Sequence, residues 1–140
     1  MAEKFKIITQ FVKDMSSETP NVETYLYVKE YIKNYNLNIE ITTKPLKNRM
    51  IEVNTKLDYM DKGKSKNKSH FEMNYASIIK IDEEIKDRKI IEKIILCDVQ
   101  KEIYPSLEKV FINLLSSSGF LNIKFEKKID FEKLYKEKFN

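Results

Sequence analysis

Three segments in the middle of the 140-residue chain alternate apolar with polar residues. Successive side chains of a β-strand point to opposite faces, so this alternation predicts strands that bury one face and expose the other. A weaker alternation near the N-terminus predicts a further strand, which ends where polar residues from Asp14 to Pro20 interrupt the pattern. The predicted strands cover residues 4–12, 37–45, 50–59 and 70–81. Strands of this kind form antiparallel sheets that are covered on one face.

The spacing of apolar residues becomes helical after residue 81, with repeats three and four positions apart. The helices predicted in this way cover residues 88–100, 104–119 and 131–139. Pro105 suits the first turn of the second helix and Gly119 suits its end, while Asp130 is a candidate N-cap for the last helix. Strands followed by helices predict an α+β fold: a four-stranded antiparallel sheet with helices packed on one face.

Length and composition fit one domain, residues 1–140, without a disulfide. Apolar runs are far shorter than the roughly 20 residues that span a bilayer, and the start, MAEKFKIITQ, lacks the apolar stretch of a signal peptide. The single cysteine, Cys97, fits a reducing compartment. We therefore expect a cytoplasmic protein that does not insert into membranes.

The distribution of charged residues indicates a surface of mixed charge and not a basic interface for nucleic acid. The chain has 26 basic and 22 acidic side chains, closely interspersed, and a net charge of +4. Basic residues concentrate in one predicted hairpin loop, DKGKSKNKS at 61–69, which is distant in sequence from the tyrosines that could stack on bases. A single-stranded nucleic-acid binder is therefore the weaker alternative, and we expect no nucleic-acid partner.

Catalytic groups are few. The chain has one histidine, His70, and nothing in the sequence places it beside Cys97. A structural zinc site wants about four ligands of the Cys/His type, whereas the chain supplies two. The glycines, Gly63 and Gly119, form no phosphate-binding loop. We expect neither an enzyme nor a bound metal or cofactor.

Four tyrosines lie between the first two predicted strands, in a segment that is otherwise polar. Exposing so much aromatic surface is unfavourable, so these side chains need a partner. One solution is a short helix, because Tyr25, Val28, Ile32 and Tyr35 have helical spacing and could enter the core.

Three segments together resemble the SecB family of bacterial protein-export chaperones. KDMSSETPN at 13–21 resembles the end of the family's first strand, with Lys13, Asp14, Ser16, Glu18, Pro20 and Asn21 in the matching places. IYPSLEKVFINLLSSSGF resembles the family's long helix, and IDFEKLYKEKF resembles its last helix. The resemblance runs from about residue 4 to residue 139 and implies a four-stranded, Greek-key-like antiparallel sheet with two helices.

The resemblance also implies a homotetramer built as a dimer of dimers. First strands would pair across one interface, through Phe5 and Ile7, and long helices would pack across another, through Leu107, Phe111 and Leu114. The apolar stripe of the long helix is wide enough for such packing. The alternative is that the whole stripe packs inside its own subunit.

For the tyrosines, the resemblance implies a role in binding unfolded precursor proteins without ATP. In the family, the connector after the first strand and the loop between the helices form apolar grooves for extended clients. Tyr25, Leu26, Tyr27, Tyr31 and Tyr35 would form one wall. Phe120, Leu121 and Ile123 would form the other wall. Burial of the tyrosines in a helical core remains the competing interpretation.

Clients of the family pass to the export ATPase SecA, which docks on an acidic sheet face. The matching positions here are Asp14 and Glu18, and Glu72 lies near a third position that is Asn74 in this chain. The family usually has a flexible tail beyond its last helix, whereas this sequence stops at Asn140, and its members are typically acidic. These departures leave open a SecB-like chaperone dedicated to one partner, such as an antitoxin.

Overall fold

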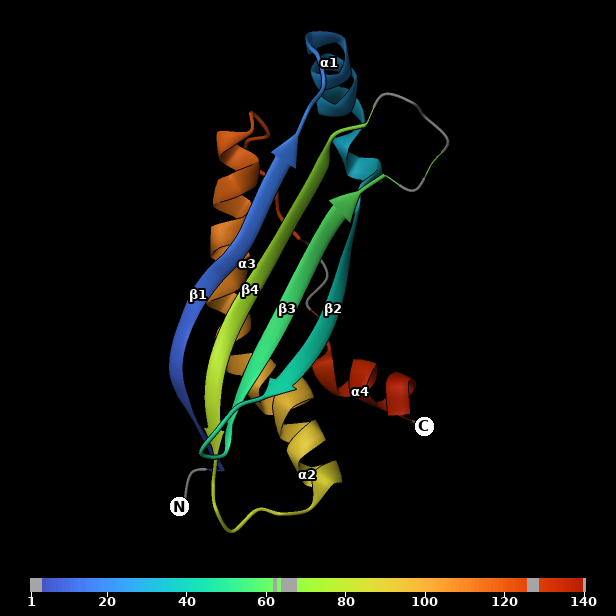
Figure 1. The fold of residues 1–140 in the computed structure, drawn as a ribbon. Helices are drawn as coiled ribbons and strands as arrows, with labels where there is room; N and C mark the ends of the chain where they lie inside the picture. The colour runs from blue at the N-terminus through green and yellow to red at the C-terminus, as the bar shows by residue number, and fades with distance from the viewer. Residues whose placement is uncertain (1–3, 62, 64–67, 126–128, 140) are drawn as a thin grey trace.

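The computed structural model describes residues 4–61, 63, 68–125 and 129–139. It contains one antiparallel sheet of four strands in the order β1-β4-β3-β2 (Figure 1). The strands are β1 Phe5–Glu18, β2 Asn36–Pro45, β3 Met50–Met60 and β4 His70–Ile81. Three consecutive strands form a meander and β1 joins it beside β4, which is the Greek-key arrangement. The predicted sheet is therefore confirmed.

The first strand is longer than the sequence pattern predicted. It continues through the polar residues to Glu18, and two register irregularities, between Ile7 and Thr9 and between Val12 and Asp14, break its alternation. Such bulges shift which face a side chain occupies, so a strand can continue where its sequence no longer alternates. As an edge strand, β1 also leaves Ile8, Phe11, Val12 and Met15 exposed.

The connector between β1 and β2 folds into a short helix. The helix α1, Val22–Tyr31, begins at Asn21, whose side chain accepts a hydrogen bond from the Thr24 amide, and a 3₁₀ turn, Ile32–Asn34, follows it. The connector is therefore helical, and of the four residues with helical spacing it buries Val28 and Tyr35, whereas Tyr25 and Ile32 are half-buried.

The remaining helices lie on one face of the sheet, as predicted (Figure 1). They are α2 Arg88–Lys93, a π-helical stretch Ile94–Val99, α3 Gln100–Ser117 and α4 Phe131–Phe139. The first three are continuous, so Pro105 lies inside α3 and the prediction that it begins a helix is wrong. Asp130 does cap α4, because its carboxylate accepts a hydrogen bond from the Lys133 amide.

The core lies between the sheet and α3. One stripe of α3 is fully buried, and it faces the inward side chains of β3 and β4. The stripe consists of Ile103, Leu107, Phe111 and Leu115. A polar pair interrupts this core where Gln100 donates a hydrogen bond to Thr55, and both side chains are fully buried. Within the described residues, no helix is long and apolar enough to cross a membrane.

The lysine-rich segment 61–69 lies mostly outside the described residues. The turn after α3 is well defined: Gly119 has a φ of 97°, and the Phe120 amide donates to the Leu115 carbonyl oxygen, which ends the helix. The Tyr25 hydroxyl donates to the Gly119 carbonyl oxygen at 2.8 Å, so this turn also anchors α1.

Replacing Gly119 by alanine should lower the free energy of unfolding by about 1–3 kcal/mol. The φ of 97° is unfavourable for any residue with a β-carbon, and that atom would lie 2.7 Å from Cε1 of Tyr25. Urea denaturation followed by circular dichroism measures the change. Gly63→Ala is the matched control, because Gly63 is exposed and its nearest neighbour would be 3.1 Å away in the Asp61 carboxylate. Equal effects of the two substitutions would contradict the prediction.

Candidate binding groove

A groove of about 1180 Å³ runs between the free side of β2, the segment 121–125 and α4. Its walls therefore come from three parts of the chain that are distant in sequence. The lining residues are Ile32, Lys33, Tyr35, Asn36, Leu37, Asn38, Ile39, Tyr59, Leu121, Asn122, Ile123, Lys124, Phe125, Ile129, Asp130, Lys133, Leu134 and Glu137.

Aromatic rings form much of the groove wall nearest the core. The Tyr59 ring lies 5.3 Å from that of Tyr35 and 5.4 Å from that of Phe125, and Phe111 packs beneath. Burial raises the pKa of Tyr35 and of Tyr59, so both phenols stay neutral. A neutral tyrosine offers an apolar face and a polar edge, which suits a surface that contacts both water and apolar ligands.

Tyr35 is held in place by two hydrogen bonds. Its hydroxyl donates to the Ser69 carbonyl oxygen at 2.8 Å and accepts from the Ser69 amide at 2.9 Å. These bonds join the end of the connector to the start of β4. The ring is therefore a fixed part of the groove and is 7% exposed.

The groove is also lined by exposed apolar side chains and by charges of both signs. Leu121 is 68% exposed and Leu134, on α4, is 42% exposed. Around them lie three lysines and two acidic residues: Lys33, Lys124, Lys133, Asp130 and Glu137. An apolar surface with a mixed charged rim suits segments of varied sequence.

The strand beside the groove has an unpaired edge. Among the described strands, β2 pairs with β3 alone, through Asn36–Pro45. Its other edge therefore presents backbone N–H and C=O groups that an extended peptide could pair with. The half-buried side chains of Leu37 and Ile39 line the groove beside this edge.

The residues predicted to bind clients fall into three places. Tyr35, Leu121 and Ile123 line the groove. Tyr25 and Phe120 pack together, with ring centres 5.2 Å apart, and Phe120 is buried. Leu26, Tyr27 and Tyr31 lie on the exposed side of α1, where the two tyrosine rings are 4.6 Å apart.

Several groove residues were not anticipated. Leu37, Ile39 and Tyr59 belong to the apolar faces of alternating strands, which the sequence pattern predicts to be buried, and Phe125 and Leu134 have no predicted role. The strand pattern could not identify them, because inward residues of an edge strand alternate in the same way as those of a central strand. The half-exposure of Leu37 and Ile39 follows from the position of β2 in the sheet, and the sequence does not show that position directly.

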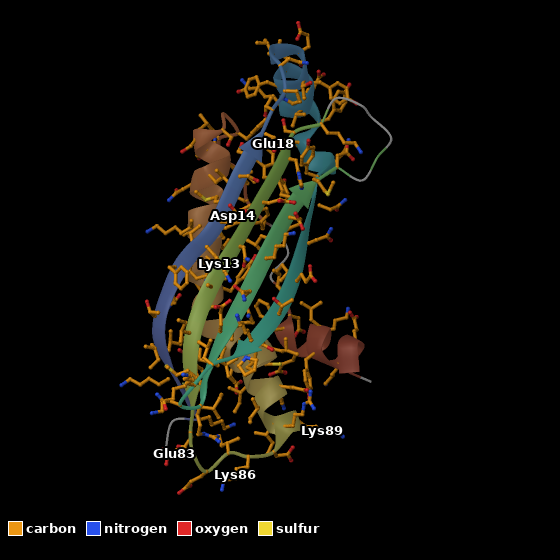
Figure 2. All side chains as sticks on the ribbon, in the orientation of Figure 1. Lys13, Asp14, Glu18, Glu83, Lys86 and Lys89 are labelled. Carbon is orange, nitrogen blue, oxygen red and sulfur yellow. The ribbon has the colours of Figure 1, made fainter. Side chains whose placement is uncertain are left out.

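The three predicted SecA-docking residues share the outer face of the sheet. In the β1–β4 register, Asp14 lies opposite Asn74, Ser16 opposite Glu72 and Glu18 opposite His70. Figure 2 shows Asp14 and Glu18 along β1. Lys13 lies beside them and forms a 2.7 Å ion pair with Glu52, which lowers the pKa of that carboxyl.

The predicted interface residues are buried or half-buried within this one chain. Leu107 and Phe111 are fully buried within this one chain, so they have no surface left for a second subunit, and the alternative of packing inside the subunit describes both. Leu114 is half-buried. Phe5 and Ile7 are half-buried against their own core, because the inward face of β1 meets the helical layer.

The two candidate catalytic side chains are separated by the sheet. Cys97 lies in the helical layer, where it is buried beside the Phe131 carbonyl oxygen, and burial raises the pKa of its thiol. His70 lies on the outer face. Among the described residues, Cys97 and His70 therefore form no nucleophile–base pair.

Comparison with known proteins gives the class of protein to which this α+β fold belongs, that of protein-export chaperones. The model of the family described as "Preprotein translocase subunit SecB" matches residues 1–140. The chain belongs to the SecB family of protein-export chaperones, which is not a class of enzymes.

Similar proteins support this assignment. The chain is 55% identical over 140 residues to a putative protein-export protein SecB of Pelagibacter ubique, with both chains covered fully. It is 24% identical over 131 residues to the protein-export protein SecB of Rhodospirillum rubrum, covering 92% of this chain and 78% of that protein. The fold matches a Mycobacterium tuberculosis SecB-like chaperone, solved in complex with a ChAD peptide from the HigA1 antitoxin, with a TM-score of 0.66 at 10% identity and coverage of 90% and 88%.

Proposed function

We propose that this chain holds unfolded precursor proteins in the cytoplasm, without ATP, and delivers them to SecA for export. The observation that carries the proposal is the apolar groove beside the unpaired edge of β2. An extended client would pair its backbone with β2 and place every second side chain against the Tyr35–Tyr59 wall. Such contacts depend little on client sequence.

Assembly would strengthen this weak binding. Exposed apolar residues of the edge strand β1 (Ile8, Phe11, Val12 and Met15) need cover, and pairing with β1 of another copy would supply it. We propose a homotetramer in which several grooves act on one client, so that effective concentration multiplies modest affinities.

Native mass spectrometry, with and without a reduced unfolded precursor, tests both the holding of clients and the homotetramer. We expect a four-chain species that takes up one precursor, and no uptake of the same precursor once folded. Uptake of folded and unfolded precursor alike would contradict client holding. A monomer that still captures the precursor would contradict only the tetramer.

A chaperone dedicated to one partner is the second candidate. The Mycobacterium tuberculosis protein with this fold was solved with an antitoxin peptide, which favours considering such a partner here. Affinities for several unrelated unfolded precursors separate the two functions. A general export chaperone binds them with similar affinities, whereas a dedicated chaperone discriminates strongly among them.

Reversing the charges of Asp14 and Glu18 to lysine should weaken SecA binding at least about 10-fold, because like charges would then meet across the interface. Both side chains are exposed, so client binding should not change. Co-sedimentation with SecA and, separately, with an unfolded precursor measures the two effects.

The matched control reverses Glu83 and Glu84, two exposed acidic residues in the loop after β4. Figure 2 shows Glu83 at the opposite end of the molecule from Glu18. If the control variant lost SecA binding equally, net charge would explain the effect and the docking face would not.

A further inference from the structure

A cluster of side chains suited to metal binding lies on the outer face of the sheet. Asp58 of β3 and Glu72 of β4 are cross-strand partners, and His70 precedes Glu72 by two residues, so the three side chains share one face. One potential ligand atom from each residue lies within 4.8 Å of the other two. The groove described above uses none of these residues.

Two carboxylates converge on the same imidazole nitrogen. Nε2 of His70 is 3.5 Å from Oδ1 of Asp58 and 3.2 Å from Oε1 of Glu72. Nε2 and this Oδ1 are shielded from solvent, yet neither has a hydrogen-bond partner among the described residues. A single N–H cannot point at both oxygens, and an unprotonated Nε2 would direct its lone pair at two anions.

The surroundings add negative charge. Glu18 lies directly opposite His70 on β1. Among the described residues, the ion pairs of Asp58 and Glu72 are both with His70. Two carboxylates therefore lie within 3.5 Å of one imidazole nitrogen, with a third acidic residue opposite it on the next strand, and a cation at this point would balance their negative charge.

We propose that Asp58, His70 and Glu72 bind a divalent metal ion of the zinc type. Zinc bonds of about 2.0–2.1 Å to nitrogen and oxygen, in tetrahedral geometry, place neighbouring donor atoms about 3.3 Å apart. The two observed separations, 3.5 and 3.2 Å, lie on either side of that value. One ion would satisfy all three donor atoms together.

The site is accessible and leaves room for another ligand. The side chains of Asp58, His70 and Glu72 are 24%, 36% and 33% exposed. Three protein donors with an open fourth position are typical of sites that also bind water or a donor from another molecule. A count of histidine and cysteine ligands along the sequence does not indicate this site, because its two carboxylates come from neighbouring strands.

Titration of the untagged, chelator-treated protein with Zn²⁺ tests the proposal. Calorimetry should show one Zn²⁺ per chain. Because His70 is the only histidine in the sequence, its ring signals in the NMR spectrum are assigned without further work, and they should shift until one equivalent is bound. Changes in groups that merely support a ligand weaken metal binding about 10–100-fold, so His70→Gln should weaken it at least about 100-fold.

The control is Glu52→Gln, which removes another carboxylate of β3 from the same face, and it should leave Zn²⁺ binding unchanged. Glu72→Gln and Asp58→Asn should each weaken binding. Imidazole signals that do not move during the titration would overturn the proposal, even if calorimetry detected zinc bound elsewhere. Equal affinity of the wild-type and His70→Gln proteins would overturn it as well. Because no client or SecA is present, these outcomes do not depend on the proposed function.

Discussion

Replacing Phe111 by alanine should lower the free energy of unfolding by about 3–5 kcal/mol. The ring is fully buried and lies 6.4 Å from that of Tyr59 and 6.3 Å from that of Phe125, between the core and the groove wall. Removing it would leave a cavity below the aromatic surface, and the continuous helix α3 could not collapse into it without moving several neighbours. Urea denaturation at two protein concentrations measures the change and detects any contribution from assembly.

Leu114→Ala is the comparison, because Leu114 belongs to the same helix but is half-buried. If Phe111 packs within its own subunit, its effect should exceed that of Leu114 and should not depend on protein concentration. An effect of Phe111→Ala that grew on dilution would instead support the subunit contact inferred from the resemblance.

The sheet and the inward face of α3 could be predicted from sequence because each depends on a local period. Alternation predicts β3 and β4, and helical spacing predicts a wide apolar stripe on α3, of which Leu107, Phe111 and Leu115 are fully buried. The cap at Asp130 also depends on local chemistry. In these elements, burial and backbone geometry favour the same residues, so one sequence is enough to predict them.

The course of β1 and the start of α3 could not be predicted in the same way. Two bulges in β1 break the alternation although pairing with β4 continues to Glu18. Pro105 was assigned to a first turn, yet the helical run begins at Arg88, where Asp87 caps it by accepting a hydrogen bond from the Lys89 amide. The pairing of β1 with β4 therefore outweighed the polar residues that interrupt the strand pattern. The cap at Asp87 likewise outweighed the signal for a helix start at Pro105.

The tyrosines show why the groove was only partly predictable. The helical spacing of Tyr25, Val28, Ile32 and Tyr35 correctly grouped Tyr35 with Val28 as buried residues. The sequence could not show that Tyr35 would meet Tyr59, or that Tyr59 would meet Phe125. Those contacts depend on which strand lies at the sheet edge and on where the segment after α3 returns. The groove is thus a product of topology, and its most exposed apolar residue, Leu121, is the most direct place to test it.

Replacing Leu121 by aspartate should weaken binding of an unfolded precursor at least about 10-fold. Burying a leucine side chain contributes about 1.5–3 kcal/mol, and each 1.4 kcal/mol changes affinity tenfold, while a charge at this position must also lose water when a client binds. Because Leu121 is 68% exposed in the free protein, the fold should not change. Fluorescence anisotropy of a labelled, reduced precursor measures the affinity, and circular dichroism checks the fold.

Ile90→Asp is the matched control, since it adds the same charge at another exposed apolar residue, on α2 and outside the groove lining. It should leave precursor affinity unchanged. Equal losses would mean that clients bind wherever apolar surface is exposed, whereas an unchanged affinity of the Leu121 variant would remove the groove from the mechanism. Raising the salt concentration should weaken wild-type binding only slightly, because the contacts at Leu121 and along the edge of β2 involve apolar surface and backbone groups, whereas binding to nucleic-acid phosphates would fall steeply.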